Sequence, residues 1–231
     1  MFNNMTADQV GYAKFAIGGI STLIVGAAIW WINELRPVLD DDLCIVNQTP
    51  IGHSVLVADI SETEDAAALP DVIRTVSERL PQYHRLSVYR IADLNDTPTD
   101  DEHAQGVWPL VRVFSACNPG RGDEVNPFLV GGRYAEKRYV EKFAAPLDDT
   151  ILATAERAGS ETSPILSALA QLPNVPEFGR DVLERKLIIR SDLLQHTPPL
   201  YTHYAHDIKD VDFALNQVGT AIPSLRDISV E

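Results

Sequence analysis

The stretch from Ser54 to Thr63, Ser-Val-Leu-Val-Ala-Asp-Ile-Ser-Glu-Thr, decides how this chain is expected to fold. It opens with an apolar run typical of a buried strand, and Asp59, Ser61 and Thr63 then follow at alternate positions. A carboxylate and two hydroxyls placed in this way can face one small hard cation, which prefers oxygen ligands. The stretch therefore predicts a buried strand followed by the first part of a metal site.

Two later segments carry side chains that could complete this site. In the first, the adjacent hydroxyls of Thr162 and Ser163 stand directly before a proline and an apolar helical pattern. The second is a strand-like run, 185–190, which is followed by Ser191 and Asp192. Because ligands bind at the carboxyl ends of the strands in an open α/β sheet, we expect the three segments to converge at one edge.

Over roughly residues 52 to 231, the chain resembles the von Willebrand factor A family. The metal-ion-dependent adhesion site of that family reads Asp-x-Ser-x-Ser or Thr, then a distant Thr, then a distant Asp. Aligning Ala168-Leu169 with the Ala-Leu pair of the family's helix start places Ser163 at the Thr position, with Thr162 as the alternative. The resemblance thus implies a Mg²⁺ or Mn²⁺ site with the ligands Asp59, Ser61, Thr63, Ser163 and Asp192.

The function that the resemblance implies is recognition of a partner protein, not catalysis. A bound divalent ion would leave one coordination position open for a carboxylate of the partner. The competing interpretation is that these residues only cap helices. Asp, Ser and Thr oxygens commonly accept hydrogen bonds from the first N–H groups of a helix, and Ser163 followed by Pro164 fits an N-cap and first helical position.

An enzyme is the main alternative function. The stretch Asp59 to Thr63 also resembles the Asp-x-Asp-x-Thr motif of magnesium-dependent phosphohydrolases, in which the first aspartate is the nucleophile. In this chain Ser61 replaces the second aspartate, which removes the usual general acid. A third possibility is a structural subunit of a membrane complex with no metal role.

A membrane anchor is predicted near the N-terminus. The segment from Phe15 to Ile32 has no charged residue, and at ~1.5 Å per residue it spans roughly 27 Å as a helix, close to the ~30 Å of a bilayer core. Trp30 and Trp31 suit the interface. A cleaved signal peptide fits less well, because no small-residue cleavage site follows, and a buried soluble helix is the other alternative.

We therefore divide the chain into a tail (1–14), a transmembrane helix (15–33), a linker (34–43) and one domain (44–231). Lys14 and Arg36 are the basic residues closest to the two ends of the helix, so the count of basic residues does not fix its orientation. A short polar tail ahead of a single helix favours a bacterial inner-membrane anchor with a periplasmic domain, and a cytoplasmic domain is the alternative.

The acidic composition argues against nucleic acid as a partner, and the sequence does not decide whether the two cysteines are bonded. The net charge of −14 and a pI near 4.7 disfavour nucleic-acid binding, because the phosphates would be repelled. Cys44 and Cys117 are either a disulfide, if their segments are neighbours in an oxidising compartment, or two small buried apolar residues.

The order of elements predicts the fold class. Strands are expected at 54–58, 86–91, 110–117 and 187–190, and helices at 66–80, 148–158, 164–172 and 207–218, with a solvent loop at 93–105. Alternating strands and helices imply an α/β three-layer sandwich with a mostly parallel central sheet. Residues 225–231 read as a loop entering a further strand, and one interpretation is that the domain lacks the family's last strand and helix.

Overall fold

The computed structural model describes residues 7–61, 63–95, 108–157, 159–175, 178–179, 181–192, 196–197, 201–202 and 228–231. Its centre is a sheet of five strands in the order β3-β2-β1-β4-β7. The strands are β1 (Gly52–Ala58), β2 (Arg85–Ile91), β3 (Leu110–Cys117), β4 (Glu184–Arg190) and β7 (Ser229–Val230). Two short strands, β5 (His196–Thr197) and β6 (Tyr201–Thr202), form a separate antiparallel pair.

The predicted strand after Gly52 is the middle strand of the sheet. β1 pairs in parallel with β2 on one side and with β4 on the other. Residues 55–58 have no exposed surface, as expected of a parallel strand that is covered on both faces. This apolar run therefore forms the centre of an α/β fold with a mostly parallel sheet.

The edges of the sheet differ from each other in direction. β7 pairs in parallel with β4 through two residues, and it is the further strand expected at 225–231. β3 runs antiparallel to β2, with a register shift between Val88 and Tyr89. An antiparallel edge strand on a parallel sheet is common in α/β proteins. Such a strand can be reached from its neighbour without a crossover helix.

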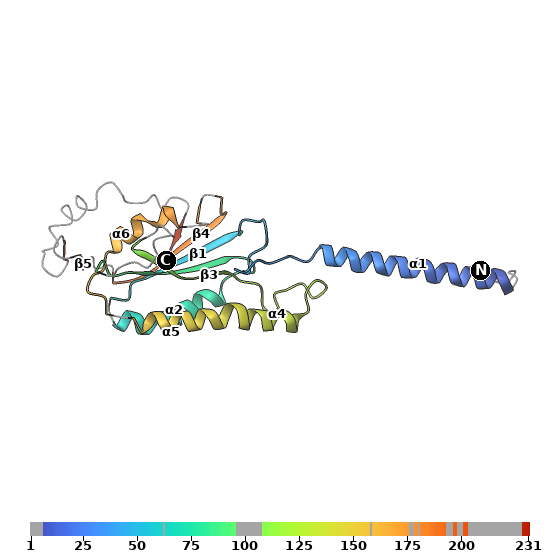
Figure 1. Ribbon diagram of the computed structural model, residues 1–231, viewed down its shortest axis with the longest axis horizontal. Coiled ribbons are helices and arrows are strands. Elements are labelled where there is room, and N and C mark those ends of the chain that lie inside the picture. The colour runs from blue at the N-terminus through green and yellow to red at the C-terminus, as the bar shows by residue number, and fades with distance from the viewer. Residues whose placement is uncertain are drawn as a thin grey trace.

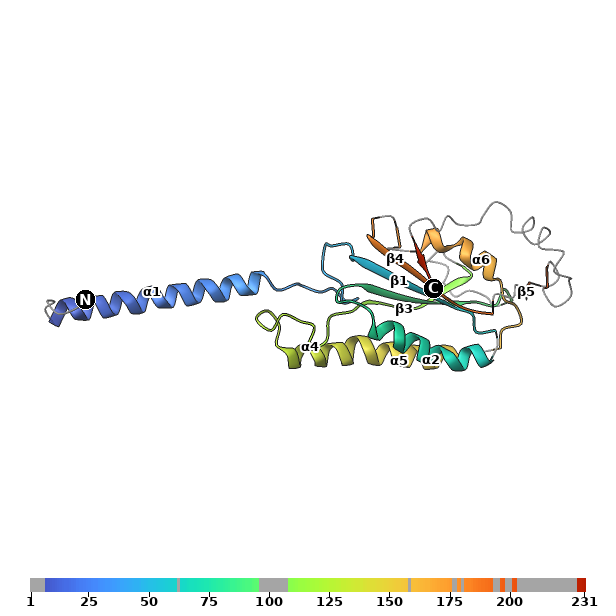
Figure 2. The same cartoon turned by 180° about the vertical axis from the view of Figure 1, so that it is seen from behind.

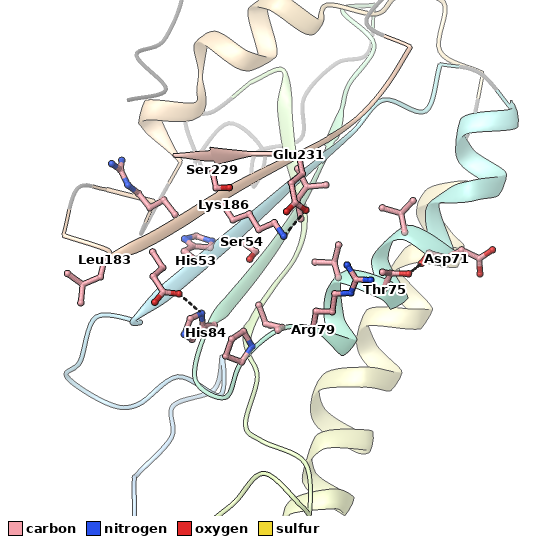
Figure 3. A pocket seen from close by; sticks show the side chains of 17 residues that line it. His53, Ser54, Asp71, Thr75, Arg79, His84, Leu183, Lys186, Ser229 and Glu231 are labelled. Carbon is pink, nitrogen blue, oxygen red and sulfur yellow. Dashed lines mark hydrogen bonds and ion pairs between the residues drawn. The ribbon is translucent and has the colours of Figure 1, made fainter. Parts of the chain in front are cut away.

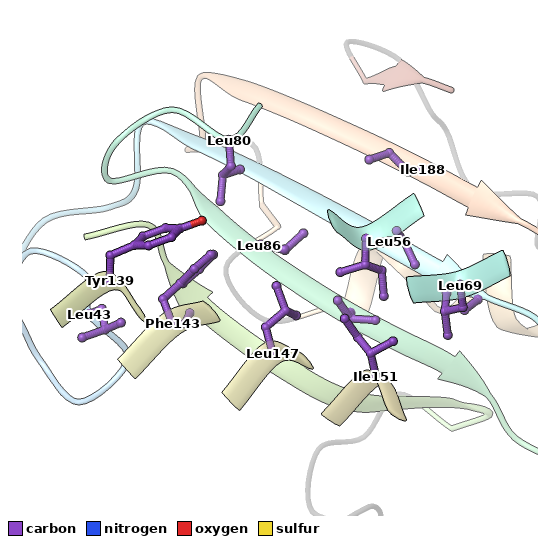
Figure 4. Packing of buried hydrophobic residues seen from close by; sticks show 14 of the residues in the cluster. Leu43, Leu56, Leu69, Leu80, Leu86, Tyr139, Phe143, Leu147, Ile151 and Ile188 are labelled. Atoms are coloured by element: carbon purple, nitrogen blue, oxygen red, sulfur yellow. The ribbon is translucent and has the colours of Figure 1, made fainter. Parts of the chain in front are cut away.

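One face of the sheet, which we call the first face, is covered by α2 (Thr63–Glu78) and by a long helix (Figure 1). The long helix runs through α4 (Gly132–Tyr139), a π-helical turn (Val140–Ala144) and α5 (Ala145–Ala155). The apolar side chains between these layers form one cluster (Figure 4), which includes Leu56, Leu69, Ile73, Leu86, Tyr139, Phe143, Leu147 and Ile151.

The prediction of a helix only from residue 148 was wrong at its start. The helix begins at Gly132, and Tyr139, Phe143, Leu147 and Ile151 recur every four residues on its buried side. Charged residues between them lower the apolar average of this segment and conceal the periodicity. Pro146 is tolerated because it lies in the first turn of α5, where the π-helical turn ends.

The opposite face, called the second face, is covered by α6 (Ile165–Ala170) and a short 3₁₀ turn (Leu172–Asn174). Their apolar side chains pack on the other side of the sheet, and Figure 2 shows α6 and α5 on opposite sides of the strands. The cluster includes Val55, Val57, Tyr89, Ile165, Leu172 and Phe178. The domain is therefore a three-layer sandwich, as predicted.

Helix α1 (Ala7–Glu34) contains the segment 15–33 and extends away from the sheet (Figure 1). Its large apolar side chains are exposed, among them Leu23, Ile24, Trp30 and Trp31. Among the residues that the structure describes, no helix has both the length and the apolar character needed to cross a membrane.

A disulfide ties the segment after α1 to the edge of the sheet. Cys44 and Cys117 are bonded, with their Cα atoms 5.0 Å apart, so the first of the two interpretations of the cysteines holds. The backbone N–H of Cys117 donates to the carbonyl of Asp42, and the Arg85 guanidinium donates to the Asp42 carboxylate at 3.0 Å. The linker is thus held to β3 by a backbone hydrogen bond and to β2 by an ion pair, and the residue that follows it is bonded to β3.

Two predicted elements lie wholly or mostly outside the described residues. The helix expected at 207–218 lies outside the described residues, and so does most of the loop expected at 93–105. The remaining predicted strands agree with β1, β2, β3 and β4 to within three residues at each end.

Candidate functional site

Asp59 is the residue around which the candidate site is built. It follows β1 directly, and only 3% of its surface is exposed. Its Oδ2 accepts hydrogen bonds from Ser163 Oγ at 2.6 Å and from Ser191 Oγ at 3.2 Å. Its Oδ1 accepts from the backbone N–H of Ser61 at 3.0 Å. Three segments of the chain thus meet at one buried carboxylate.

The sheet topology explains why these segments meet. From β1 the chain continues to β2 and β3 on one side, whereas β4 and β7 lie on the other side of β1. Strand order therefore reverses between β1 and β4, and ligand sites of α/β proteins lie outside the carboxyl ends of strands at such a point. Asp59 and Ser191 are the first residues after β1 and β4, and the Asp59 N–H donates to the Arg190 carbonyl at 2.8 Å.

The backbone at Ser163 is held by a short β-bridge. Its N–H donates to the carbonyl of His196 at 2.7 Å, and the His196 N–H donates back to Ser163 at 3.0 Å. The residue before the first turn of α6 is Pro164, not Ser163, and no side chain caps the helix. The competing interpretation, in which Ser163 and Pro164 are the N-cap and the first helical residue, is therefore wrong, because α6 begins one residue later. The Ser163 hydroxyl is directed to Asp59 instead of the helix end.

Thr162, the alternative to Ser163, belongs to a different cluster. Its hydroxyl donates to Asp93 Oδ1 at 2.9 Å and accepts from the Leu94 N–H at 2.8 Å. Asp93 Oδ2 also accepts from the backbone N–H of Glu161 and from the Ser160 hydroxyl. Asp93 thereby fixes the loop that presents Ser163, and sequence reasoning missed it. The signal was an Asp-x-Asn turn, in which the Asn95 N–H donates to Asp93 Oδ1.

These hydrogen bonds set the charge of Asp93. Burial raises the pKa of the Asp93 carboxyl, but the donors of Asn95, Thr162, Glu161 and Ser160 outweigh burial and hold the pKa below its ordinary value of 3.8. Asp93 is accordingly ionised at neutral pH and orders the loop beside the site.

The other predicted ligands are Ser61, Thr63 and Asp192. Ser61 is half-buried, and its backbone contacts Asp59. Thr63 is the first residue of α2, and its side chain lies outside the described part of the structure. Asp192 is exposed, one residue beyond Ser191. At this end of β4 the side chain that contacts Asp59 is thus Ser191, a residue that the sequence motif had not selected as a ligand.

The donor set suits a hard cation. One carboxylate and two hydroxyls face each other in a buried position, and Asp192 lies next to them in sequence. Mg²⁺ and Mn²⁺ prefer such oxygen donors. No group of three or more His, Cys, Asp or Glu residues that could hold a metal is found in the part of the chain that the structure describes.

A polar hollow of about 440 Å³ adjoins this cluster. Ile60, which follows Asp59, contributes to its wall, and the Gly159 N–H donates to the Ile60 carbonyl at 3.1 Å. Arg90 and Arg157 also line it. Two guanidinium groups and the carboxylates of Asp93 and Glu161 thus line the hollow beside the candidate site.

Comparison with known proteins found no matching family model and no similar curated protein. The site is therefore interpreted from its own geometry.

Proposed function

We propose that this chain is a membrane-anchored, divalent-metal-dependent protein-binding module that captures a carboxylate of a partner protein. The metal would be Mg²⁺ or Mn²⁺, held by Asp59, Ser61, Thr63, Ser163 and Asp192. The observation that supports this proposal best is the meeting of Asp59 with the hydroxyls of Ser163 and Ser191, which lie 104 and 132 residues further along the chain. Helix capping does not explain such contacts.

Each residue has a separate task in this proposal. Asp59 supplies the negative charge, and its contact with the Ser61 N–H keeps the carboxylate turned toward the serines. Ser163 and Ser191 offer hydroxyl oxygens that donate to Asp59 and can rotate to present lone pairs to a cation. A bound divalent ion supplies positive charge and an open coordination position, which lets an acidic surface accept a carboxylate.

The geometry favours binding over hydrolysis. In a phosphohydrolase, Asp59 would have to attack the substrate, yet both of its oxygens accept hydrogen bonds and the residue is buried. Ser61 stands where that motif places the general acid. Two measurements distinguish the alternatives. A phosphohydrolase would hydrolyse a generic phosphate ester, whereas a purely structural subunit would bind no metal.

We also propose that α1 anchors the chain in a bacterial inner membrane and that the domain lies in the periplasm. The absence of charge from Phe15 to Ile32 and the exposed apolar side chains of α1 support the anchor. The Cys44–Cys117 disulfide supports an oxidising compartment. A C-terminal alkaline phosphatase fusion is expected to be active, and an inactive, well-expressed fusion would reverse this topology.

Calorimetric titration of the full chain in detergent with Mg²⁺ or Mn²⁺ tests the metal site. We expect saturable binding to the unaltered chain and none to Ser163→Ala or Asp59→Asn, because each change removes an oxygen ligand or its charge. Ser167→Ala, an exposed position on α6, is the matched control and is expected to bind as the unaltered chain does. Equal binding by Ser163→Ala and Ser167→Ala would contradict the proposed ligand set.

A further inference from the structure

A long groove lies on the first face of the sheet, between α2 and the strands β4 and β7 (Figure 3). Its volume is about 820 Å³, and it shares no lining residue with the Asp59 cluster. We call it the α2 groove. Residues of α2 and the following turn form one wall, and Ser54, Lys186, Ile188 and Glu231 contribute to the sheet side.

The wall and floor of the α2 groove carry an apolar strip. Val72 and Val76 stand one helical turn apart on α2, Leu80 follows a turn later, and Ile188 lies across from them on β4. Leu80 and Ile188 belong to the buried cluster of the first face, and the two valines pack against it while remaining half-buried. The α2 groove therefore gives direct access to the edge of the core.

The shape of the α2 groove suits an elongated occupant. On α2 the lining begins at Asp71, roughly 10 Å along the axis from the end of the helix at Glu78 at ~1.5 Å per residue, and it continues to Leu80 in the turn that follows. An apolar stripe of this length, with polar residues on both sides, matches the apolar face of an amphipathic helix, whose anchors recur at three- and four-residue spacing.

Most charges around the α2 groove are already paired. Lys186 Nζ lies 2.7 Å from Glu231 Oε2, and Arg74 contacts Asp71 at 3.6 Å. Burial lowers the pKa of His84 below its ordinary value of 6.5, and Glu184 offsets only part of this effect, so His84 adds little charge at neutral pH.

Arg79 is the exception. It is exposed on the α2 side of the groove (Figure 3), and within the described ranges it forms no salt bridge. The unmatched charge on the α2 side of the rim is thus positive, although the chain as a whole carries −14. On the far side of the groove, the exposed Glu184 carboxylate has mainly neutral His84 as its partner and stays negative. An occupant with an acidic side chain near Arg79 would complement this rim.

We propose that the α2 groove binds an amphipathic helix of a partner protein. The apolar stripe of that helix packs on Val72, Val76, Leu80 and Ile188, and an acidic side chain on its flank pairs with Arg79. This partner site is separate from the Asp59 site and does not depend on a metal.

Two designed helical peptides of about 14 residues, four turns long, test the proposal with the full chain in detergent. Both carry leucines at i, i+3, i+4 and i+7, and the flanking charges are glutamates in one and lysines in the other. Fluorescence anisotropy of the labelled peptides is measured against the unaltered chain, Arg79→Glu and Arg133→Glu. Arg133→Glu makes the same change of charge at an exposed residue of α4, outside the groove lining.

We expect the glutamate peptide to bind the unaltered chain and Arg133→Glu alike, and Arg79→Glu about tenfold more weakly, because the pair at the rim becomes a repulsion. The lysine peptide is expected to prefer Arg79→Glu. Equal affinities of each peptide for all three chains, or no saturable binding, would overturn the proposal. A concentration-dependent dimer that Arg79→Glu disrupts, without peptide binding, would also overturn it in favour of a second copy of the chain.

Discussion

At the scale of single residues, neighbouring hydroxyls take different tasks at the candidate site. Thr162 donates to Asp93 and Ser163 donates to Asp59, although they are adjacent in sequence. Extended backbone at this point directs consecutive side chains to opposite sides. Because of this alternation, Thr162 binds the Asp93 carboxylate, which holds the loop, while Ser163 faces the Asp59 carboxylate at the candidate site.

Asp93 gives the loop a dependence on pH. Its pKa is lowered in the folded chain relative to the ordinary value of 3.8. Its contribution to stability is therefore fully present above that value, and it is lost as the pH falls below it through the lower folded pKa. We expect Asp93→Asn to flatten the acid limb of the free energy of unfolding, measured by urea titration between about pH 5 and pH 2.

Asp71→Asn, at an exposed residue of α2, is the control for that measurement. It is expected to leave the acid limb almost unchanged, because exposed ion pairs contribute little. An identical pH profile for the unaltered chain and Asp93→Asn would show that Asp93 does not hold the loop through its charge.

Two of the residues predicted from the motif are at the centre of the site, and two that matter were missed. Asp59 and Ser163 could be selected because one follows an apolar strand and the other precedes an apolar helical pattern, although α6 itself begins two residues after Ser163. Ser191 and Asp93 were not selected, because their role depends on which atoms meet across gaps of 132 and about 70 residues. Side-chain direction over such distances follows from the completed sheet and cannot be read from local pattern.

At the scale of elements, the long helix α4–α5 is the main difference from the sequence-based expectation. Its buried side follows Tyr139, Phe143, Leu147 and Ile151, whereas only the part after residue 147 was predicted. The strands were located well because each is a short apolar run bounded by turns. The sequence of β3 does not indicate that the strand is antiparallel, because the direction of a strand depends on how the chain connects it to its neighbour.

Phe143 is expected to be the residue on which this helix depends most. It has no exposed surface, and its ring contacts Phe114 of β3 and Tyr139. Phe143→Ala should lower the free energy of unfolding by about 3 to 5 kcal/mol, because it removes buried apolar contacts and leaves a cavity. Urea denaturation of the full chain in detergent measures this change.

Leu152→Ala provides the comparison on the same helix. Leu152 is 58% exposed, so its truncation is expected to change the free energy of unfolding by less than about 0.5 kcal/mol. Similar losses for the two variants would mean that α5 does not pack on the sheet through the Phe143 side.

At the scale of the whole molecule, the disulfide joins the segment after α1 to the β3 edge of the sheet. It links residues 73 positions apart and therefore restricts the unfolded chain strongly. Reduction is expected to lower the free energy of unfolding by roughly 4 kcal/mol on the chain-entropy estimate. The measurement is denaturation of the full chain with and without dithiothreitol.

The Cys44→Ala, Cys117→Ala double variant separates the bond from other effects of the reductant. It is expected to match the reduced chain and to show no response to dithiothreitol. An unaltered chain whose denaturation midpoint stays constant on reduction would contradict a stabilising role for this bond. Sequence alone left the pairing open, because neither cysteine indicates by itself that the linker runs beside β3.

The position of this bond also determines how the molecule would carry mechanical load. Cys117 pairs in register with Arg85 at the amino end of β2, whereas Asp59 lies at the carboxyl end of β1, at the opposite end of the sheet. If α1 anchors the chain and the Asp59 site captures a partner, as proposed above, tension between them would run along the strands. The backbone from Cys44 through β1 to Asp59 would carry this load covalently, and the disulfide at Cys44 would pass part of it to β3.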